Sequence, residues 1–149
     1  ASFNASVSGG PTGNYAQISW AGATGNGYNG SSAGGGPGAG VSFLNSSSTD
    51  VNRAKITMDV SANVVNAHLA VQLNTIEGKN YGYNIKITET NWSNITLLLK
   101  DFKDNYGYGA NLATDLDVSK INEIKIGVVQ GDTPNPTTIN FDNIKLIYD

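Results

Sequence analysis

Two neighbouring stretches decide the fold: AKITMDV at residues 54–60 and AHLAVQLN at residues 67–74. In both, apolar side chains recur at alternate positions, and successive side chains of a β-strand point to opposite faces of a sheet. The first stretch would bury Ile56 and Met58 and turn Lys55 outward. Such a two-faced strand is typical of an antiparallel sheet that packs on one side only.

The same alternation recurs along the chain, and helical periodicity is almost absent. Gly accounts for 18 of the 149 residues, and Gly destabilises helix interiors by about 1 kcal/mol relative to Ala. We therefore expect one all-β domain over residues 1–149, a β-sandwich of two antiparallel sheets. The predicted strands cover residues 15–20, 40–44, 54–60, 67–74, 83–89, 95–99, 123–130 and 138–147.

Turn-forming residues separate these strands. Residues 77–80, EGKN, predict a hairpin turn, and residues 131–136, GDTPNP, predict the connection between the last two strands. Residues 22–40 form a glycine-rich stretch without periodicity. In a compact domain such a stretch is either a functional loop that lies over a sheet or a surface excursion, and the sequence leaves both open.

Charge and composition exclude several classes of function. Twelve acidic and nine basic residues give a net charge of −3, so the chain lacks the basic stripe that binds a nucleic-acid backbone. No apolar run reaches the roughly 20 residues that span a bilayer, and we expect no membrane partner. Without cysteine there is no disulfide, thiol nucleophile or thiolate metal site. The abundance of Asn, Ser, Thr, Gly and Tyr favours a secreted or cell-surface protein of bacterial type.

Three segments of the C-terminal part carry a family resemblance. They are NWSNITLLLKDF at residues 91–102, LDVSKINEIKIG at residues 116–127 and INFDNIKL at residues 139–146. They resemble the C-terminal half of jelly-roll carbohydrate-binding modules, particularly those of families eleven, four and sixteen. In such modules a Trp opens a strand, an Asp-Phe pair follows it, and an acid-containing strand closes the domain. The resemblance covers residues 90–149 and implies a β-sandwich jelly roll that binds a glycan without catalysis.

The resemblance also implies a structural calcium ion. Members of these families often hold calcium near the domain ends, with an acid of the first strand and the acid of the final strand. Asp142 matches the second acid, whereas Asn4 stands where many relatives have an acid. The Asn4 amide keeps a carbonyl oxygen but lacks a charge, and calcium prefers roughly six to eight oxygens that include carboxylates. The predicted metal ligands are Asp142 and Asn4.

Polar residues on one predicted sheet face suggest a sugar site. A sugar ring presents apolar C–H faces and hydroxyls, so its site needs exposed aromatic rings and planar amides. The alternation places His68, Gln72 and Asn74 opposite the apolar side chains of their strand, and Lys86 lies outward on the next strand. Gln72 is the strongest candidate because it is central, and Gln130 is a weaker one. The alternative is an ordinary solvated face.

Aromatic residues supply the candidate stacking platforms. Trp20 ends a short strand beside the glycine-rich stretch and is the first choice, although Ile18 shares its face and a core position is the alternative. Two Tyr-Gly-Tyr motifs each place two rings on one side with a Gly that allows close approach of a ligand; hairpin packing is the alternative. Trp92 is left out because the Trp at this point of the resembling modules is commonly structural. The tyrosine candidates are Tyr81, Tyr83, Tyr106 and Tyr108, followed by Tyr15 and Tyr28.

These observations predict a non-catalytic module that binds a β-linked polysaccharide, a β-glucan, mannan or xylan, on a concave sheet face. We expect a secreted monomer that forms the accessory domain of a larger protein with a linked catalytic domain. We expect no enzyme, because glycoside hydrolysis uses two carboxylates about 5 to 10 Å apart and the three glutamates are isolated. Two alternatives stay open: a structural or adhesive spacer domain, and a small glycan-active enzyme.

Overall fold

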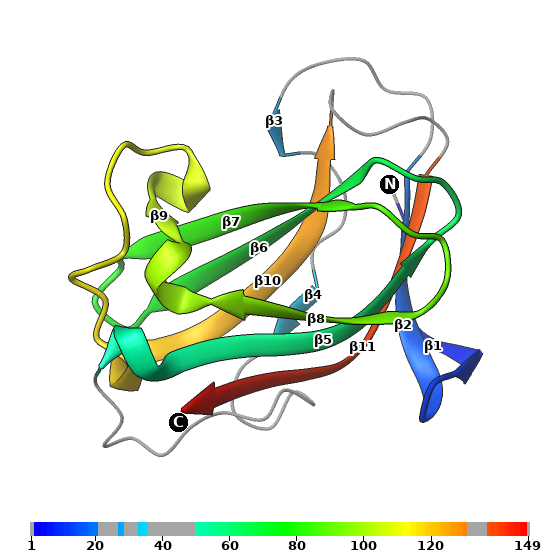
Figure 1. The fold of residues 1–149 in the computed structure, drawn as a ribbon, viewed down its shortest axis with the longest axis horizontal. Coiled ribbons are helices and arrows are strands. Elements are labelled where there is room, and N and C mark those ends of the chain that lie inside the picture. Colours follow the sequence, from blue (N-terminus) through cyan, green and yellow to red (C-terminus); the bar gives the residue numbers. More distant parts are fainter. Residues whose placement is uncertain (1, 21–26, 29–32, 36–49, 131–136, 149) are drawn as a thin grey trace.

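The computed structural model describes residues 2–20, 27–28, 33–35, 50–130 and 137–148, which form two antiparallel β-sheets around a common core (Figure 1). The side chains of residues 2–6, 20, 27–28, 33–35 and 128–130 are outside the described part. The five-stranded sheet consists, in spatial order, of β1 (Ser2–Gly10), β2 (Gly13–Trp20), β11 (Thr137–Tyr148), β5 (Ala54–Ala62) and β8 (Ser93–Leu98).

The six-stranded sheet packs against the first. In spatial order it contains β3 (Gly27–Tyr28), β10 (Ile121–Gln130), β6 (Ala67–Thr75), β7 (Asn80–Ile87) and β9 (Lys103–Asp104), and β4 (Ala33–Gly35) also pairs with β10. Short 3-10 helices lie at η1 (Val51–Arg53), η2 (Leu99–Asp101), η3 (Asn105–Gly107) and η4 (Val118–Lys120). Within the described ranges, no helix is long and apolar enough to cross a membrane.

The predicted β-sandwich is confirmed, and most predicted strands coincide with observed ones. β7 begins at Asn80 rather than at residue 83, and the predicted strand at residues 40–44 lies outside the described part of the chain. β1 was not among the predicted strands, although the family resemblance places Asn4 in a first strand. This strand consists largely of Ser, Gly and Ala, which are weak or indifferent strand formers, and its pairing with β2 shifts register twice.

The glycine-rich stretch contains two strands that were not predicted. β3 pairs Tyr28 with Val129, and β4 pairs Ala33 with Ile126, so both lie antiparallel to β10. An edge strand is held by its backbone N–H and C=O groups, and it therefore needs no alternation of apolar side chains. The prediction of a stretch without strands is wrong at residues 27–28 and 33–35.

The core fixes which way every strand faces. Ile56 and Met58 of β5 belong to the same buried cluster as Leu69, Val71 and Leu73 of β6. Burying one such side chain stabilises the fold by about 1.5–3 kcal/mol. Because the odd-numbered residues of β6 fill the core, its even-numbered residues face away from it.

The predicted turn at residues 77–80 joins β6 to β7. The Thr75 carbonyl accepts from Gly78 N–H at 3.0 Å, and the Lys79 carbonyl accepts from Thr75 N–H at 2.9 Å. Gly78 has a φ of +82°, a conformation that Gly adopts without a steric cost. This turn sets the β6–β7 register, which places Gln72 opposite Gly82.

Candidate functional site

The candidate site is the side of β7, β6 and β10 that faces away from the core, called here the outer face. The strand register arranges its residues in rows that cross the three strands. The rows are Lys86–His68, Asn84–Ala70–Gly127, Gly82–Gln72–Lys125 and Asn80–Asn74–Glu123. The small residues Ala70, Gly82 and Gly127 lie among polar side chains, and His68, Gln72, Asn74 and Lys86 share one face as predicted.

Gln72 lies at the centre of the outer face, but it is more buried than the sequence suggested. Only 6% of its surface is exposed. Lys125 is its neighbour on β10, and η3 packs against both β6 and β7. Its side-chain amide forms no hydrogen bond to any residue in the described part of the chain. A buried amide without a partner costs about 1–3 kcal/mol, so a ligand that binds it would recover that free energy.

The other polar side chains of the outer face differ in their hydrogen bonds, ion pairs and exposure. Asn74 Nδ2 donates to Glu123 Oε1 at 2.6 Å, and Lys125 Nζ lies 3.6 Å from the same oxygen. Asn84 and Lys86 are exposed. Asn84 was not named as a site residue, although the alternation that places Lys86 outward applies to it equally.

Tyr81 and Tyr83 do not lie on the outer face. Tyr81 is 2% exposed, and Tyr83 packs against Phe102 with ring centroids 5.6 Å apart. Both are odd-numbered residues of β7, the set that includes the core residue Ile87, whereas Gly82 between them faces outward. The packing alternative therefore holds for Tyr81, whereas Tyr83 is only partly buried and its role as a sugar platform stays a prediction.

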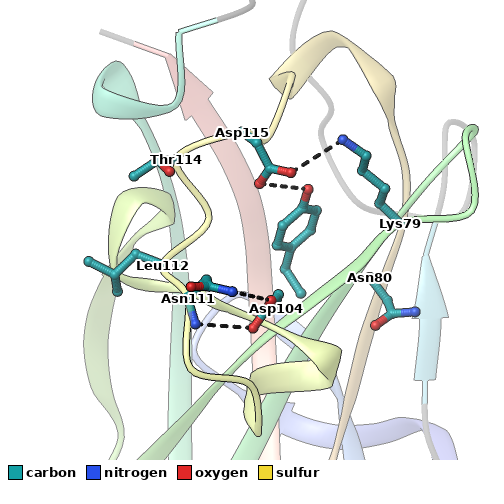
Figure 2. A pocket seen from close by; sticks show the side chains of 8 residues that line it. Lys79, Asn80, Asp104, Asn111, Leu112, Thr114 and Asp115 are labelled. Atoms are coloured by element: carbon teal, nitrogen blue, oxygen red, sulfur yellow. Dashed lines mark hydrogen bonds and ion pairs between the residues drawn. The ribbon is translucent and has the colours of Figure 1, made fainter.

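The hydroxyl of Tyr81 reaches a polar pocket of about 530 Å³ at the end of the sandwich. Tyr81 Oη donates to Asp115 Oδ1 at 3.2 Å. Lys79 points toward the same carboxylate, with Nζ 3.3 Å from Oδ2 (Figure 2). Burial, together with the charge of Asp115, raises the pKa of Tyr81 to about 12. Burial would raise the pKa of Asp115, but the two hydrogen bonds outweigh it and the pKa is lowered. These groups stabilise one another, so we interpret the pocket as structural.

The second Tyr-Gly-Tyr motif covers the end of η3 and its C-cap residue Tyr108, and η3 packs on the outer face. The Tyr106 carbonyl occupies the place that a Cβ of residue 82 would take, and Gly107 lies against the Gly82 backbone. Asn80 Oδ1 accepts from Tyr106 N–H at 3.2 Å. The two glycines thus allow two chain segments to approach each other, and the close approach of a ligand stays a prediction.

The rings of this motif remain accessible. Tyr106 is 41% exposed and Tyr108 is 52% exposed. Asn105 and Tyr106 adopt left-handed backbone conformations with φ of +48° and +57°, which Asn tolerates but which are costly for a bulky residue such as Tyr. The backbone of Tyr106 is anchored over Gly82, which pairs with Gln72 in the β6–β7 register, so Tyr106 lies beside the outer face.

The remaining aromatic candidates are dispersed. Tyr15 lies on β2 of the five-stranded sheet, where its ring meets Trp92 edge-on with centroids 5.2 Å apart. Trp92 is half-buried in this contact, in agreement with a structural role. The side chains of Trp20, Tyr28 and Gln130 lie outside the described part, but the backbones of Tyr28 and Gln130 belong to the β3–β10 edge of the six-stranded sheet.

The predicted calcium ligands lie on the five-stranded sheet. Asp142 is opposite Asp59 on β5, and its two oxygens accept from Thr12 Oγ1 at 3.1 Å and from Asn143 N–H at 2.8 Å. Asn4 belongs to β1, which is separated from β11 by β2.

Among the described residues, the carboxylates of Asp142 and Asp59 accept hydrogen bonds from neighbouring groups. Among the residues that the structure describes, no group of three or more His, Cys, Asp or Glu side chains could hold a metal ion. The Asn4 side chain is outside the described part. The Asn143 and Asn94 amides instead donate to Asp59 and lower its pKa. Calcium stays a prediction of the family resemblance.

Comparisons with known proteins identify the fold. No protein-family model matches the chain, and no curated protein matches its sequence. A family 11 carbohydrate-binding module of a cellulosomal cellulase of Clostridium thermocellum superposes with a TM-score of 0.63 at 22% identity, over 99% of this chain and 81% of that one.

Two further solved structures agree. A family 11 module from Clostridium thermocellum in complex with a β-1,3-1,4-mixed-linked tetrasaccharide gives a TM-score of 0.62 at 22% identity, over 99% of this chain and 82% of that chain. An exo-β-agarase gives 0.61 at 13% identity, over 92% of this chain and 20% of that chain. The protein therefore has the jelly-roll β-sandwich fold of family 11 carbohydrate-binding modules.

Proposed function

We propose that the protein is a non-catalytic carbohydrate-binding module that holds a β-linked polysaccharide on its outer face. The observation that carries the proposal is Gln72, whose buried amide has no hydrogen-bond partner in the described part of the chain. The fold supports the proposal, since the similar family 11 module was solved with a β-1,3-1,4-mixed-linked tetrasaccharide. A β-glucan is accordingly the first ligand to test, ahead of mannan and xylan.

The proposed binding mechanism combines amide hydrogen bonds with aromatic stacking. One side-chain amide offers a carbonyl acceptor and an N–H donor, which match two neighbouring hydroxyls of a sugar ring. The exposed ring of Tyr106 would add stacking worth about 1 kcal/mol beyond its buried area. Gln72 belongs to β6, and the backbone of Tyr106 is anchored on Gly82 and Asn80 of β7, so little backbone entropy is lost when the glycan docks.

The wider setting is part of the proposal. We propose a secreted or cell-surface monomer that acts as the accessory domain of a larger glycan-degrading protein. The exo-β-agarase supports this, because the matching region is 20% of that chain. A non-catalytic role is supported by Glu123, the only carboxylate in the four rows of the outer face, which is engaged by Asn74 and Lys125.

Substitution of Gln72 by Met tests the proposal, because it keeps the size of the side chain and removes the amide. We expect Gln72→Met to abolish retardation in affinity electrophoresis on soluble β-glucan without lowering the melting temperature, since a buried amide without a partner does not stabilise the fold. The matched control is Gln17→Met. Gln17 Nε2 donates to Asn140 Oδ1 at 2.8 Å on the other sheet, so this variant should bind normally and melt earlier.

Three results would contradict the proposal. If the wild-type protein is not retarded by any β-glucan, mannan, xylan or uronan, the spacer alternative is favoured. Release of reducing sugar from any of these polymers would favour the enzyme alternative. Normal binding by Gln72→Met would place the glycan somewhere other than on the outer face.

A further inference from the structure

A cavity of about 240 Å³ lies beside η3 at the β7–β9 edge of the outer face. It is lined by Gly82, Tyr83, Asn84, Asp101, Lys103 and Gly107. Asn84 heads the row that continues through Ala70 to Gly127, so the cavity lies at the end of that row. Pockets for drug-sized ligands usually measure about 300–1,000 Å³, and this smaller space suits a single sugar ring.

Three polar side chains that line the cavity are available to bind a ligand. Asn84, Asp101 and Lys103 are exposed, and none of them forms a hydrogen bond or ion pair through its side chain with another described residue. The Asp101 carboxylate accepts hydrogen bonds, the Lys103 ammonium donates them, and the Asn84 amide does both. One acid and one base leave no net charge, so the cavity favours a neutral polyhydroxylated ring over an anion or a cation.

The wall of the cavity is fixed before any ligand arrives. Gly107 packs on the Gly82 backbone, and Asn80 Oδ1 holds the N–H of Tyr106 at 3.2 Å. Asn105 and Tyr106 keep positive φ angles that the chain maintains only where its surroundings determine them. Such strained turns are concentrated at ligand-binding sites, and a preformed wall reduces the entropy lost on binding.

We propose that this cavity is a sugar subsite, which binds one neutral ring of the glycan held on the outer face. The inference rests on the proposed function and extends it to Asp101 and Lys103, which lie outside the rows of the outer face. The glycan would run across the strands along the Gly127–Ala70–Asn84 row. Its last ring would enter the cavity, where Asp101 and Asn84 bind neighbouring hydroxyls and Lys103 donates to a third.

A length series of β-glucan oligosaccharides, measured by isothermal titration calorimetry, tests the subsite. The affinity of the wild-type protein should rise with each added sugar until the cavity is filled. Asp101→Asn keeps the shape of the side chain and removes its charge, and we expect it to lose the gain from the last sugar while short oligosaccharides bind normally. Asn84→Ala should lose the same gain. The double variant should lose less than the sum of the two, because both residues act on one ring.

Lys100→Gln is the matched control, since Lys100 is exposed beside Asp101 but does not line the cavity; it should retain the whole length dependence. Binding of all oligosaccharides with the wild-type length dependence by Asp101→Asn and Asn84→Ala would overturn the subsite and leave the proposed function intact. The subsite would also be overturned if the two variants lost the same affinity for oligosaccharides of every length. Failure of the wild-type protein to bind any oligosaccharide or glycan polymer would overturn both.

Discussion

Tyr81 was predicted to bind a sugar, but the structure buries it in a structural role. The pKa of its hydroxyl tests that role. Its pKa of about 12 predicts that a spectrophotometric titration detects one tyrosine that ionises well above the reference value of about 10. Because the folded-state pKa is raised, its stabilising contribution is complete below the unfolded-state pKa of about 10 and is lost as the pH rises through 12. Asp115→Asn should lower the pKa of Tyr81 and leave it above 10, since burial remains.

The face on which a side chain lies could be predicted where the alternation was applied to every residue of a strand. Lys86 was correctly predicted to face outward, and the same alternation places Ile87, Tyr81 and Tyr83 inward. The two rings were nevertheless taken as candidates, because a Tyr-Gly-Tyr motif resembles a binding platform. The burial of Gln72 could not be predicted, since it depends on its surroundings in the folded sheet rather than on its own strand.

At the scale of elements, η3 depends on the absence of a side chain at residue 82. In Gly82→Ala the new Cβ would collide with the Tyr106 backbone, so η3 must move. We expect a loss of about 1–3 kcal/mol of unfolding free energy in urea denaturation, together with weaker binding of the longer oligosaccharides.

Gly78→Ala separates these two effects. Gly78 lies in the same hairpin with a φ of +82°, and a Cβ there meets no atom within 4 Å. This variant should lose stability through its backbone conformation alone and should bind the glycan normally. If Gly82→Ala retained wild-type stability, or if Gly78→Ala weakened binding equally, the support of the subsite by η3 would be refuted.

The strands that the sequence predicted are those with a buried apolar face. β5 and β6 alternate clearly because each fills the core on one side only, and both were predicted within one or two residues of their ends. β3 and β4 join β10 through backbone pairing, which leaves no trace in the side-chain pattern. The contact between η3 and Gly82 joins residues more than twenty positions apart, and neither Tyr-Gly-Tyr motif reveals its partner.

At the scale of the whole molecule, calcium is the prediction with the widest consequence. Asp142 accepts from Thr12 in the β1–β2 hairpin and lies opposite Asp59 on β5, so an ion at Asp142 would connect several strands of the five-stranded sheet. An ion that binds only the folded chain raises the melting temperature. We expect a chelator to lower the melting temperature and excess calcium to restore it.

Asp142→Asn provides the decisive comparison, because the carboxylate is the ligand that calcium prefers. This variant also perturbs the contacts with Thr12 and Asn143. Its melting temperature in calcium is therefore compared with its own melting temperature in chelator, and not with that of the wild-type protein. The difference between calcium and chelator should be present in the wild-type protein and absent in the variant. Equal melting temperatures of the wild-type protein in both conditions would show that hydrogen bonds among Thr12, Asp59, Asp142 and Asn143 hold this part of the sheet without a metal.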